Sequence, residues 1–311
     1  MLDATVIVLR FVQYGAAAIL MGSPLFFLYA LPRNGAAASN NFRWPKPLLA
    51  SAAAALLLAT VAGLLFQTAV MAGSLSEALK PNSLVAVLTG MNLGKSALVR
   101  APLALGALAL VLFIRPRRRL WLTLATLGTL AAASFSWMGH GAATEGPGHE
   151  VHLMADIVHS WAAAVWIGAL VGFLLLLYSS GRDAERLRAL HRALHRFSGV
   201  GTVLVAVLVA SGLVNSWFLV GTDHLSAIWT TDYGRLLLLK LVGFLGMLGL
   251  AAANRFRHTP ALMLSLETAN GDRTGISHLR RSLIVEALLG FGVLALVAWF
   301  GMLEPPSSYT V

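Results

Sequence analysis

Long apolar runs dominate this chain and leave few folds open to it. Of its residues, 58% are hydrophobic and 12% are charged, whereas soluble domains carry about 25% charged residues. About 20 apolar residues in a helix span the ~30 Å hydrocarbon core of a lipid bilayer. We therefore expect an all-α, polytopic transmembrane helical bundle that forms a single integral membrane domain over residues 1–311. About eight helices are predicted, near residues 5–31, 48–72, 91–114, 120–139, 151–178, 197–220, 234–254 and 282–303.

Lysine and arginine residues gather in alternate connections between these runs. Basic connections face the cytoplasm in membrane proteins, so the connections that contain Arg33, Arg115, Arg182 and Arg255 are assigned to the inner side. The opposite connections are mostly acidic. Both termini are thus expected on the outer, periplasmic side. The net charge of +10 is accounted for by these connections, so no nucleic-acid partner is expected.

The histidines are concentrated in one short part of the chain. Four of the nine lie in the segment from His140 to His159, and from His149 the offsets to His152, Asp156 and His159 are three, seven and ten residues. Those offsets place the side chains on one face of a helix. Polar groups in an apolar helix are costly and indicate a functional site by default. Because imidazole is the commonest metal ligand, we expect a metal site at the outer end of the fourth and fifth helices.

The chemistry of the neighbouring residues favours copper. The chain has no cysteine, so a soft metal ion would be held by histidine and methionine. Thioether sulfur selects Cu(I), whereas imidazole with carboxylate suits Cu(II), and both oxidation states stay open. Methionine is also a common apolar filler. The candidate metal ligands are His140, His149, His152, Asp156, His159, Met138 and Met154.

Several ionisable residues within the apolar runs need an explanation. Long cationic side chains such as Arg100 and Lys240 can snorkel toward the membrane surface. Alternatively, Arg100 pairs with Asp156 or with an anionic ligand. Glu286 lies nearer the inner face and could carry a proton, form an inner exit group or pair with a neighbouring polar residue. Trp166 is too deep for an interfacial residue and is expected to pack over the site.

Taken together, the order and spacing of these motifs resemble the copper resistance protein D family (CopD, PcoD). The resemblance covers essentially the whole chain and is strongest from residue 139 onward. The segments that carry it are residues 139–149, DIVHSWAAAVWIGAL at 156–170, SGLVNSW at 211–217, YGRLLLLK at 233–240, Asn254-Arg255 and Val285-Glu286.

The resemblance implies copper transport or import across the bacterial inner membrane, as part of copper resistance or homeostasis. It also implies a periplasmic copper-binding partner of the CopC type. On this interpretation copper is captured by the His/Asp/Met site at the outer end of the fourth and fifth helices. No ATP-binding P-loop motif is present in the sequence, so an ATP-driven pump is not expected.

Three other functions stay open at this point. Buried histidines can ligate haem in a membrane electron-transfer protein, although the fifth helix supplies most of the histidines here. A copper-sensing membrane protein without transport would use the same ligands. A membrane metalloenzyme would use histidine and aspartate to activate water, but no His-Glu-x-x-His pattern is present. The expectation is therefore a protein that is not an enzyme.

Overall fold

The computed structural model describes residues 2–30, 44–139, 146, 148–180, 184–267 and 273–308. Throughout this described part the chain is helical and contains no β-strand. The elements are α1 (Leu2–Ala30), α3 (Pro45–Ala72), α4 (Leu75–Ala78), α5 (Pro81–Gly90), α6 (Asn92–Phe113), α7 (Arg118–Ala133), α9 (His149–Ser180), α10 (Ala184–Leu219), α11 (Ala227–Thr230), α12 (Asp232–Ala253), the π-helical turn η1 (Asn254–His258), α13 (Thr259–Glu267), α14 (Arg273–Phe300) and the 3₁₀ turn η2 (Pro306–Ser308).

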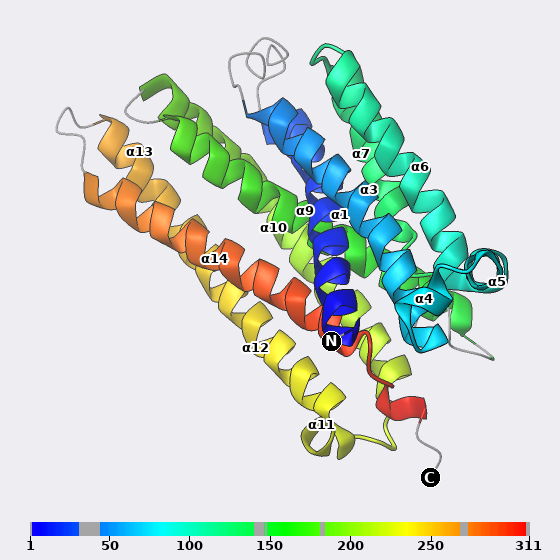
Figure 1. Ribbon diagram of the computed structural model, residues 1–311. Coiled ribbons are helices and arrows are strands. Elements are labelled where there is room, and N and C mark those ends of the chain that lie inside the picture. The colour runs from blue at the N-terminus through cyan, green and yellow to red at the C-terminus, as the bar shows by residue number, and fades with distance from the viewer. Residues whose placement is uncertain are drawn as a thin grey trace.

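The long helices form one bundle with α1 and α9 at its centre (Figure 1). Helices α3, α6 and α7 lie on one side of this central pair, and α10, α12 and α14 lie on the other. The start of α1 and the end of α14 lie at the same end, beside α4, α5 and α11. Because α9 also begins there, we call it the histidine end. The opposite end, where α10 begins and α13 lies, is called the basic end.

Seven helices within the described residues are long and apolar enough to cross a membrane: α1, α3, α6, α9, α10, the α12–α13 segment and α14. The remaining predicted span, near residues 120–139, corresponds to α7. Its 16 residues are fewer than the ~20 that cross a bilayer fully. The expected polytopic helical bundle is therefore confirmed. Whether its histidine end faces the periplasm stays a prediction from the basic connections.

Three predicted helix boundaries at the basic end are wrong by many residues. Helix α10 begins at Ala184 rather than near residue 197, and α14 begins at Arg273 rather than near 282. The helix that contains α12 continues through η1 and α13 to Glu267 rather than stopping near 254. Hydropathy marks only the apolar part of a helix, whereas arginine, leucine and alanine favour helix beyond it as well. The basic segments therefore extend the helices instead of forming loops.

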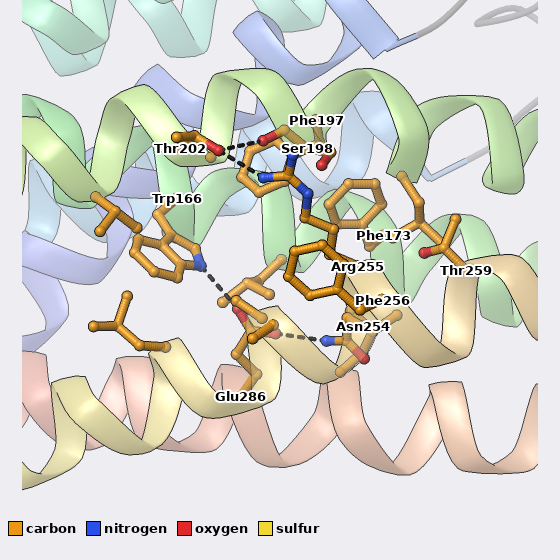
Figure 2. Close-up of a pocket in the computed structure, with 18 residues that line it drawn as sticks. Trp166, Phe173, Phe197, Ser198, Thr202, Asn254, Arg255, Phe256, Thr259 and Glu286 are labelled. Carbon is orange, nitrogen blue, oxygen red and sulfur yellow. Dashed lines mark hydrogen bonds between the residues drawn. The ribbon is translucent and has the colours of Figure 1, made fainter.

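The one π-helical segment among the described residues is η1, which joins α12 to α13. A π turn widens the helix by one residue, and such turns are frequent at functional sites. It begins at Asn254, which is buried and whose side chain faces Glu286 of α14 (Figure 2). The π turn thus brings Asn254 to Glu286 near the basic end of the bundle. The spacing of apolar residues in the sequence does not reveal such a turn.

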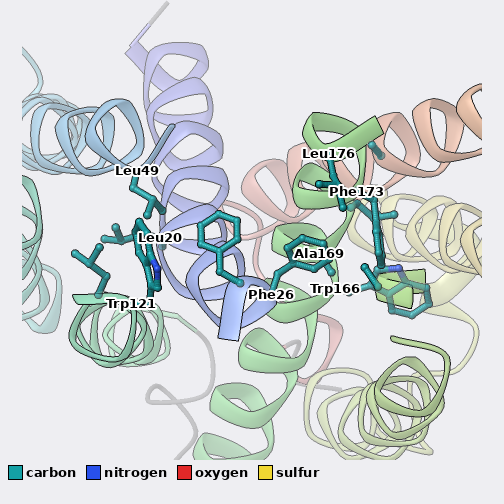
Figure 3. Packing of buried hydrophobic residues seen from close by; sticks show 14 of the residues in the cluster. Leu20, Phe26, Leu49, Trp121, Trp166, Ala169, Phe173 and Leu176 are labelled. Carbon is teal, nitrogen blue, oxygen red and sulfur yellow. The ribbon is translucent and has the colours of Figure 1, made fainter. Parts of the chain in front are cut away.

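Close helix packing holds the centre of the bundle together. A Cβ atom on Gly168 of α9 would lie 2.4 Å from the backbone of Gly22 on α1, so the two helices touch through their glycines. The rings of Phe26 and Phe173 pack edge to face with centroids 4.9 Å apart. Figure 3 shows this pair together with buried Trp121 and the other side chains around α1. Because α1 and α9 lie so close, the face of α9 that bears the histidines is held in a fixed orientation.

Candidate functional site

A cavity of about 220 Å³ that holds several polar side chains lies at the histidine end between α1, α7, α9, α10, α12 and α14. Three of the predicted ligands, His152, Asp156 and His159, line it from α9. Lys240 of α12 lines the same cavity. Further polar side chains come from α1, α9, α10 and α12: Tyr14, Ser160, Asn215, Ser216 and Tyr233. The helical spacing that was read from the sequence therefore does bring three candidates to one cavity.

His152 is held at the outer part of this cavity. Its side chain is 1% exposed and stacks on Phe218 of α10, with ring centroids 4.8 Å apart and nearly parallel planes. Gly148 just before α9 has φ of +90°, a conformation that favours glycine, and a Cβ there would lie 3.0 Å from the Phe218 ring. The glycine therefore lets Phe218 approach the start of α9 and fix the imidazole ring.

His159 lies deeper, two turns along α9. Its Nδ1 lies 3.0 Å from the Oγ of Ser211 on α10, and the Ser211 hydroxyl donates to the backbone carbonyl of Val207 at 2.6 Å. Since the serine proton is used in that bond, Ser211 Oγ accepts from the His159 Nδ1–H. The tautomer this arrangement favours leaves the Nε2 lone pair unprotonated. A histidine oriented in this way by a partner on Nδ1 is well suited to bind a metal ion through Nε2.

Asp156 lies between the two histidines along α9, one turn from each. Within the described part of the chain its carboxylate makes no hydrogen bond and no ion pair shorter than 4.0 Å. Lys240 lines the same cavity, but its ammonium nitrogen is more than 4.0 Å from the Asp156 carboxylate oxygens. A carboxylate of this kind in a cavity keeps its oxygens available to a cation.

The other predicted ligands lie elsewhere. His149 and Met154 are exposed on α9, and Met154 has 55% of its surface accessible. The sulfur of Met138 lies 3.3 Å from Nη2 of Arg100 and accepts a hydrogen bond from it. His140 lies outside the described residues. Of the seven candidates, the structure brings only three of the described ones into one cavity.

Those three side chains are arranged in series rather than in a cluster. Among the residues that the structure describes, no group of three or more His, Cys, Asp or Glu side chains is close enough to hold one metal ion. Successive offsets of four and three residues along a helix separate them by about 6 and 4.5 Å of rise. The site therefore resembles a row of neighbouring positions more than a closed coordination shell.

Arg100 does not snorkel and does not pair with Asp156. It is 2% exposed, and its guanidinium donates to Oε1 of Gln13 at 2.7 Å and to Oγ of Ser134 at 2.9 Å. The guanidinium carbon also lies 3.6 Å from the centre of the Phe135 ring. With the Met138 contact, neutral partners on α1 and on the segment that follows α7 surround the cation. Its position is set by this network, and Arg100 is not among the described residues that line the cavity.

A second cavity continues from the first toward the basic end. It has a volume of about 250 Å³, shares His159 and Lys240 with the first cavity, and is otherwise lined mainly by apolar residues as far as Trp166 and Met247. Trp166 is buried and shares this second cavity with His159, but it is not among the described residues that line the first cavity. Its indole Nε1 donates to Oε1 of Glu286 at 2.9 Å, a polar contact that its sequence position does not predict.

Family comparisons agree with this architecture. The family described as "Copper resistance protein D-like, N-terminal domain" matches residues 1–150, and the family "Copper resistance protein D" matches residues 191–300. Copper resistance protein D of Pseudomonas syringae pv. tomato is 36% identical over 308 residues, which is 97% of each chain. This chain belongs to the copper resistance protein D family. The resemblance noted from the sequence motifs is therefore confirmed.

Two further relatives extend the comparison. The copper transport protein CutJ of Bacillus subtilis (strain 168) is 29% identical over 305 residues, which cover 96% of this chain and 52% of that protein. The inner membrane protein YebZ of Escherichia coli (strain K12) is 29% identical over 309 residues, 98% of this chain and all of that protein. No solved structure matches the chain.

Sequence reasoning missed several residues of the site. Ser211 orients His159, and Tyr14, Tyr233 and Asn215 line the cavity. Ser211 and Asn215 fall within the segment SGLVNSW, which carries part of the family resemblance. Their role depends on how α10 packs against α9, and apolar periodicity does not specify that register. Tyr233 opens the segment YGRLLLLK, which also carries part of the resemblance, whereas the sequence offered no signal for Tyr14.

Proposed function

We propose that this protein moves copper ions across the bacterial inner membrane, from the periplasm inward, through the cavities along α9. The observation that carries the proposal is the cavity at the histidine end, which His152, Asp156 and His159 line from a single helix face. The family of the chain and the name of the copper transport protein CutJ, its relative, support copper as the substrate. In this role the protein performs no chemical reaction and is not an enzyme.

The direction follows from the basic connections. Arginines lie at the basic end, in the first part of α10 and in η1, and such residues stay in the cytoplasm when helices insert. This distribution supports a histidine end in the periplasm and a multi-pass bundle in the inner membrane. Copper then enters at His152 and passes His159 on its way inward.

A row of ligands suits transport better than tight storage. Conduction requires sites that bind well enough to admit an ion but weakly enough to release it, usually several in series. His152, Asp156 and His159 are spaced in this way along α9. An ion held by two neighbouring side chains at a time can be passed from one to the next. Imidazole and carboxylate are competent for Cu(II), and imidazole also binds Cu(I).

The rim of the cavity suits transfer from a second protein. His149 is exposed at the start of α9, one turn before buried His152. A periplasmic copper carrier of the CopC type would approach this rim and exchange its ligands for those of α9. Exposed His149 thus receives copper, and the buried residues conduct it.

The experiment is copper uptake into proteoliposomes that contain the purified protein, with and without a reductant to supply Cu(I) or Cu(II). Loss of the group that hydrogen-bonds a metal-ligating histidine already lowers metal affinity about 10–100-fold. Loss of the ligand itself in His159→Ala is therefore expected to reduce copper uptake at least tenfold. The matched control is His195→Ala, an exposed histidine on α10 at the basic end, which leaves uptake unchanged. Equal uptake by His159→Ala and the wild type would contradict the proposal. Copper that binds without crossing in the wild type would indicate a sensor instead.

A further inference from the structure

A third cavity lies near the basic end and contains a buried acid. It has a volume of about 250 Å³, and Glu286 of α14 lines it together with Trp166 of α9 and Asn254 of η1 (Figure 2). Glu286 is 3% exposed. Its Oε1 accepts from the Trp166 indole at 2.9 Å, and its Oε2 accepts from Nδ2 of Asn254 at 2.8 Å. Both carboxylate oxygens are thus held by neutral donors from two different helical segments.

No cation neutralises this carboxylate. Within the described residues no lysine, arginine or histidine nitrogen lies within 4.0 Å of Glu286. Among the described residues that line the cavity, Arg255 of η1 is the only other charged one. It is exposed and donates to Oγ1 of Thr202 at 2.8 Å.

The elements packed around the cavity supply no other titratable group. Helix α9 contributes apolar side chains and the Trp166 indole, α10 contributes Ser198 and Thr202 beside apolar residues, and α13 contributes Thr259. The lining residues of α12 are apolar as well. A buried acid without a counter-charge is costly to keep ionised in a membrane. The structure therefore favours exchange of a proton at Glu286.

The partners of Glu286 can satisfy either protonation state. The Asn254 Oδ1 atom is buried and has no hydrogen-bond partner. A half-turn of the amide exchanges donor and acceptor, so Asn254 donates through Nδ2 to the carboxylate or accepts through Oδ1 from the carboxylic acid. Trp166 donates to the other oxygen in both states. An acid that stays ionised would need only donors around it, whereas Asn254 can also accept from the protonated form.

The acid also lies on the same route as the copper site. Trp166 lines both this cavity and the middle cavity, and the middle cavity shares His159 with the outer one. Three cavities thus follow one another along α9, from the histidine end to the basic end. The side chains that line them change along this order. Imidazole and carboxylate groups line the outer cavity, mainly apolar residues line the middle one, and the acid Glu286 with its amide partner Asn254 lines the third.

We propose that Glu286 is a proton-carrying residue that couples copper movement along α9 to the proton gradient. This inference rests on the proposed transport function for the coupling, but not for the proton binding. In one state the Glu286 O–H donates to Asn254 Oδ1. When the covalent O–H bond of Glu286 breaks, the proton leaves through the third cavity to solvent at the basic end. The resulting carboxylate then accepts a hydrogen bond from Asn254 Nδ2. No oxidant or reductant is needed.

The first test needs no copper. Infrared difference spectra between acidic and alkaline samples of the purified protein are expected to contain the carbonyl stretch of a carboxylic acid, which disappears in Glu286→Gln. Asn254→Leu removes the amide acceptor and should shift the frequency of that band without abolishing it. If the band persists unchanged in Glu286→Gln and does not move in Asn254→Leu, the proton does not reside on Glu286. The Asn254→Leu arm decides the matter even where Glu286→Gln fails to fold.

The second test measures coupling. Copper uptake by wild-type proteoliposomes should change at least tenfold when a pH gradient is imposed, and a dye inside the vesicles should report proton movement in step with copper. Glu286→Gln should retain copper binding at the histidine end but lose the dependence on the gradient. Thr202→Val, which alters the same cavity but not Glu286, is the control and keeps the dependence. Gradient-dependent uptake in Glu286→Gln would overturn the coupling, whereas no copper uptake in any variant would refute the transport function instead.

Discussion

The two sides of the bundle handle their buried polar groups differently. On the side of α6 and α7, Arg100 is enclosed by Gln13, Ser134, Met138 and the Phe135 ring, and its guanidinium has partners for Nε, Nη1 and Nη2. Next to α10, α12 and α14, the polar groups of α9 line cavities instead. There Asp156 makes no hydrogen bond with the described residues.

This difference separates a structural charge from a functional one. A buried polar group with all its partners in place stabilises one arrangement, and removing a partner leaves the others unsatisfied. A polar group with spare capacity in a cavity can accept a ligand without disrupting the fold. The Arg100 network is therefore expected to maintain the bundle, and the α9 cavities are expected to bind and conduct copper.

The largest effect is expected for Arg100→Leu. It leaves Gln13 and Ser134 without their donors, at about 1–3 kcal/mol for each buried group, so the free energy of unfolding should fall by about 3 kcal/mol. Lys240→Leu removes a charge that lines the cavity and should change it by less than about 1 kcal/mol. Denaturation in detergent micelles, followed by tryptophan fluorescence, measures both. Equal losses in the two variants would remove the distinction between the two sides.

A smaller effect is expected at the partner of His159. Ser211→Ala removes the acceptor that orients the imidazole ring, so copper affinity should fall about tenfold with little change in thermal stability. Ser216→Ala is the matched control, because Ser216 lines the same cavity and donates only to the Gly212 carbonyl. Isothermal titration with copper measures both variants. A similar loss in Ser216→Ala would mean that general packing, and not ring orientation, sets the affinity.

Removing the positive charge of the cavity should act in the opposite direction. Lys240 lines the outer and middle cavities with His159, so Lys240→Met should raise copper affinity by about fivefold, equivalent to roughly 1 kcal/mol of charge repulsion. The same titration in high salt provides the control, since screening is weak for buried charges. A decrease in affinity would indicate that Lys240 instead holds Asp156 in position.

The smallest effects are expected at the two methionines. Met154→Leu changes an exposed side chain and should leave both copper affinity and stability unchanged. Met138→Leu removes the sulfur that contacts Arg100 and should lower stability by less than about 1.5 kcal/mol, again with unchanged affinity. Loss of copper binding in either variant would add a thioether to the ligand set and bring the Arg100 side of the bundle into the site.

The sequence predicted the general architecture well because lipid imposes strong constraints. Long apolar runs must become helices, since a bilayer offers no other partner for backbone polar groups. The predicted spans missed the start of α10 at Ala184 and the continuation of the α12 helix beyond Asn254. These parts are helical without being apolar. Helix propensity, not hydropathy, decides such boundaries.

The candidate site was partly predictable for a similar reason. His152, Asp156 and His159 share a cavity because helical spacing on one element fixes their common face. Contacts between elements were not predictable in this way. The pairing of His159 with Ser211, and the placement of Arg100 beside Gln13, depend on the rotation of neighbouring helices.

X-ray absorption at the copper edge of the copper-loaded protein tests the central claim most directly, because it counts imidazole ligands without requiring transport. The account predicts imidazole scattering in the wild type, a reduced signal in His152→Ala and in His159→Ala, and a full signal in His195→Ala. It also predicts a full signal for Arg100→Lys, provided that this variant folds. Unchanged imidazole scattering in the His152→Ala/His159→Ala double variant would contradict the assignment of the α9 cavity as the copper site.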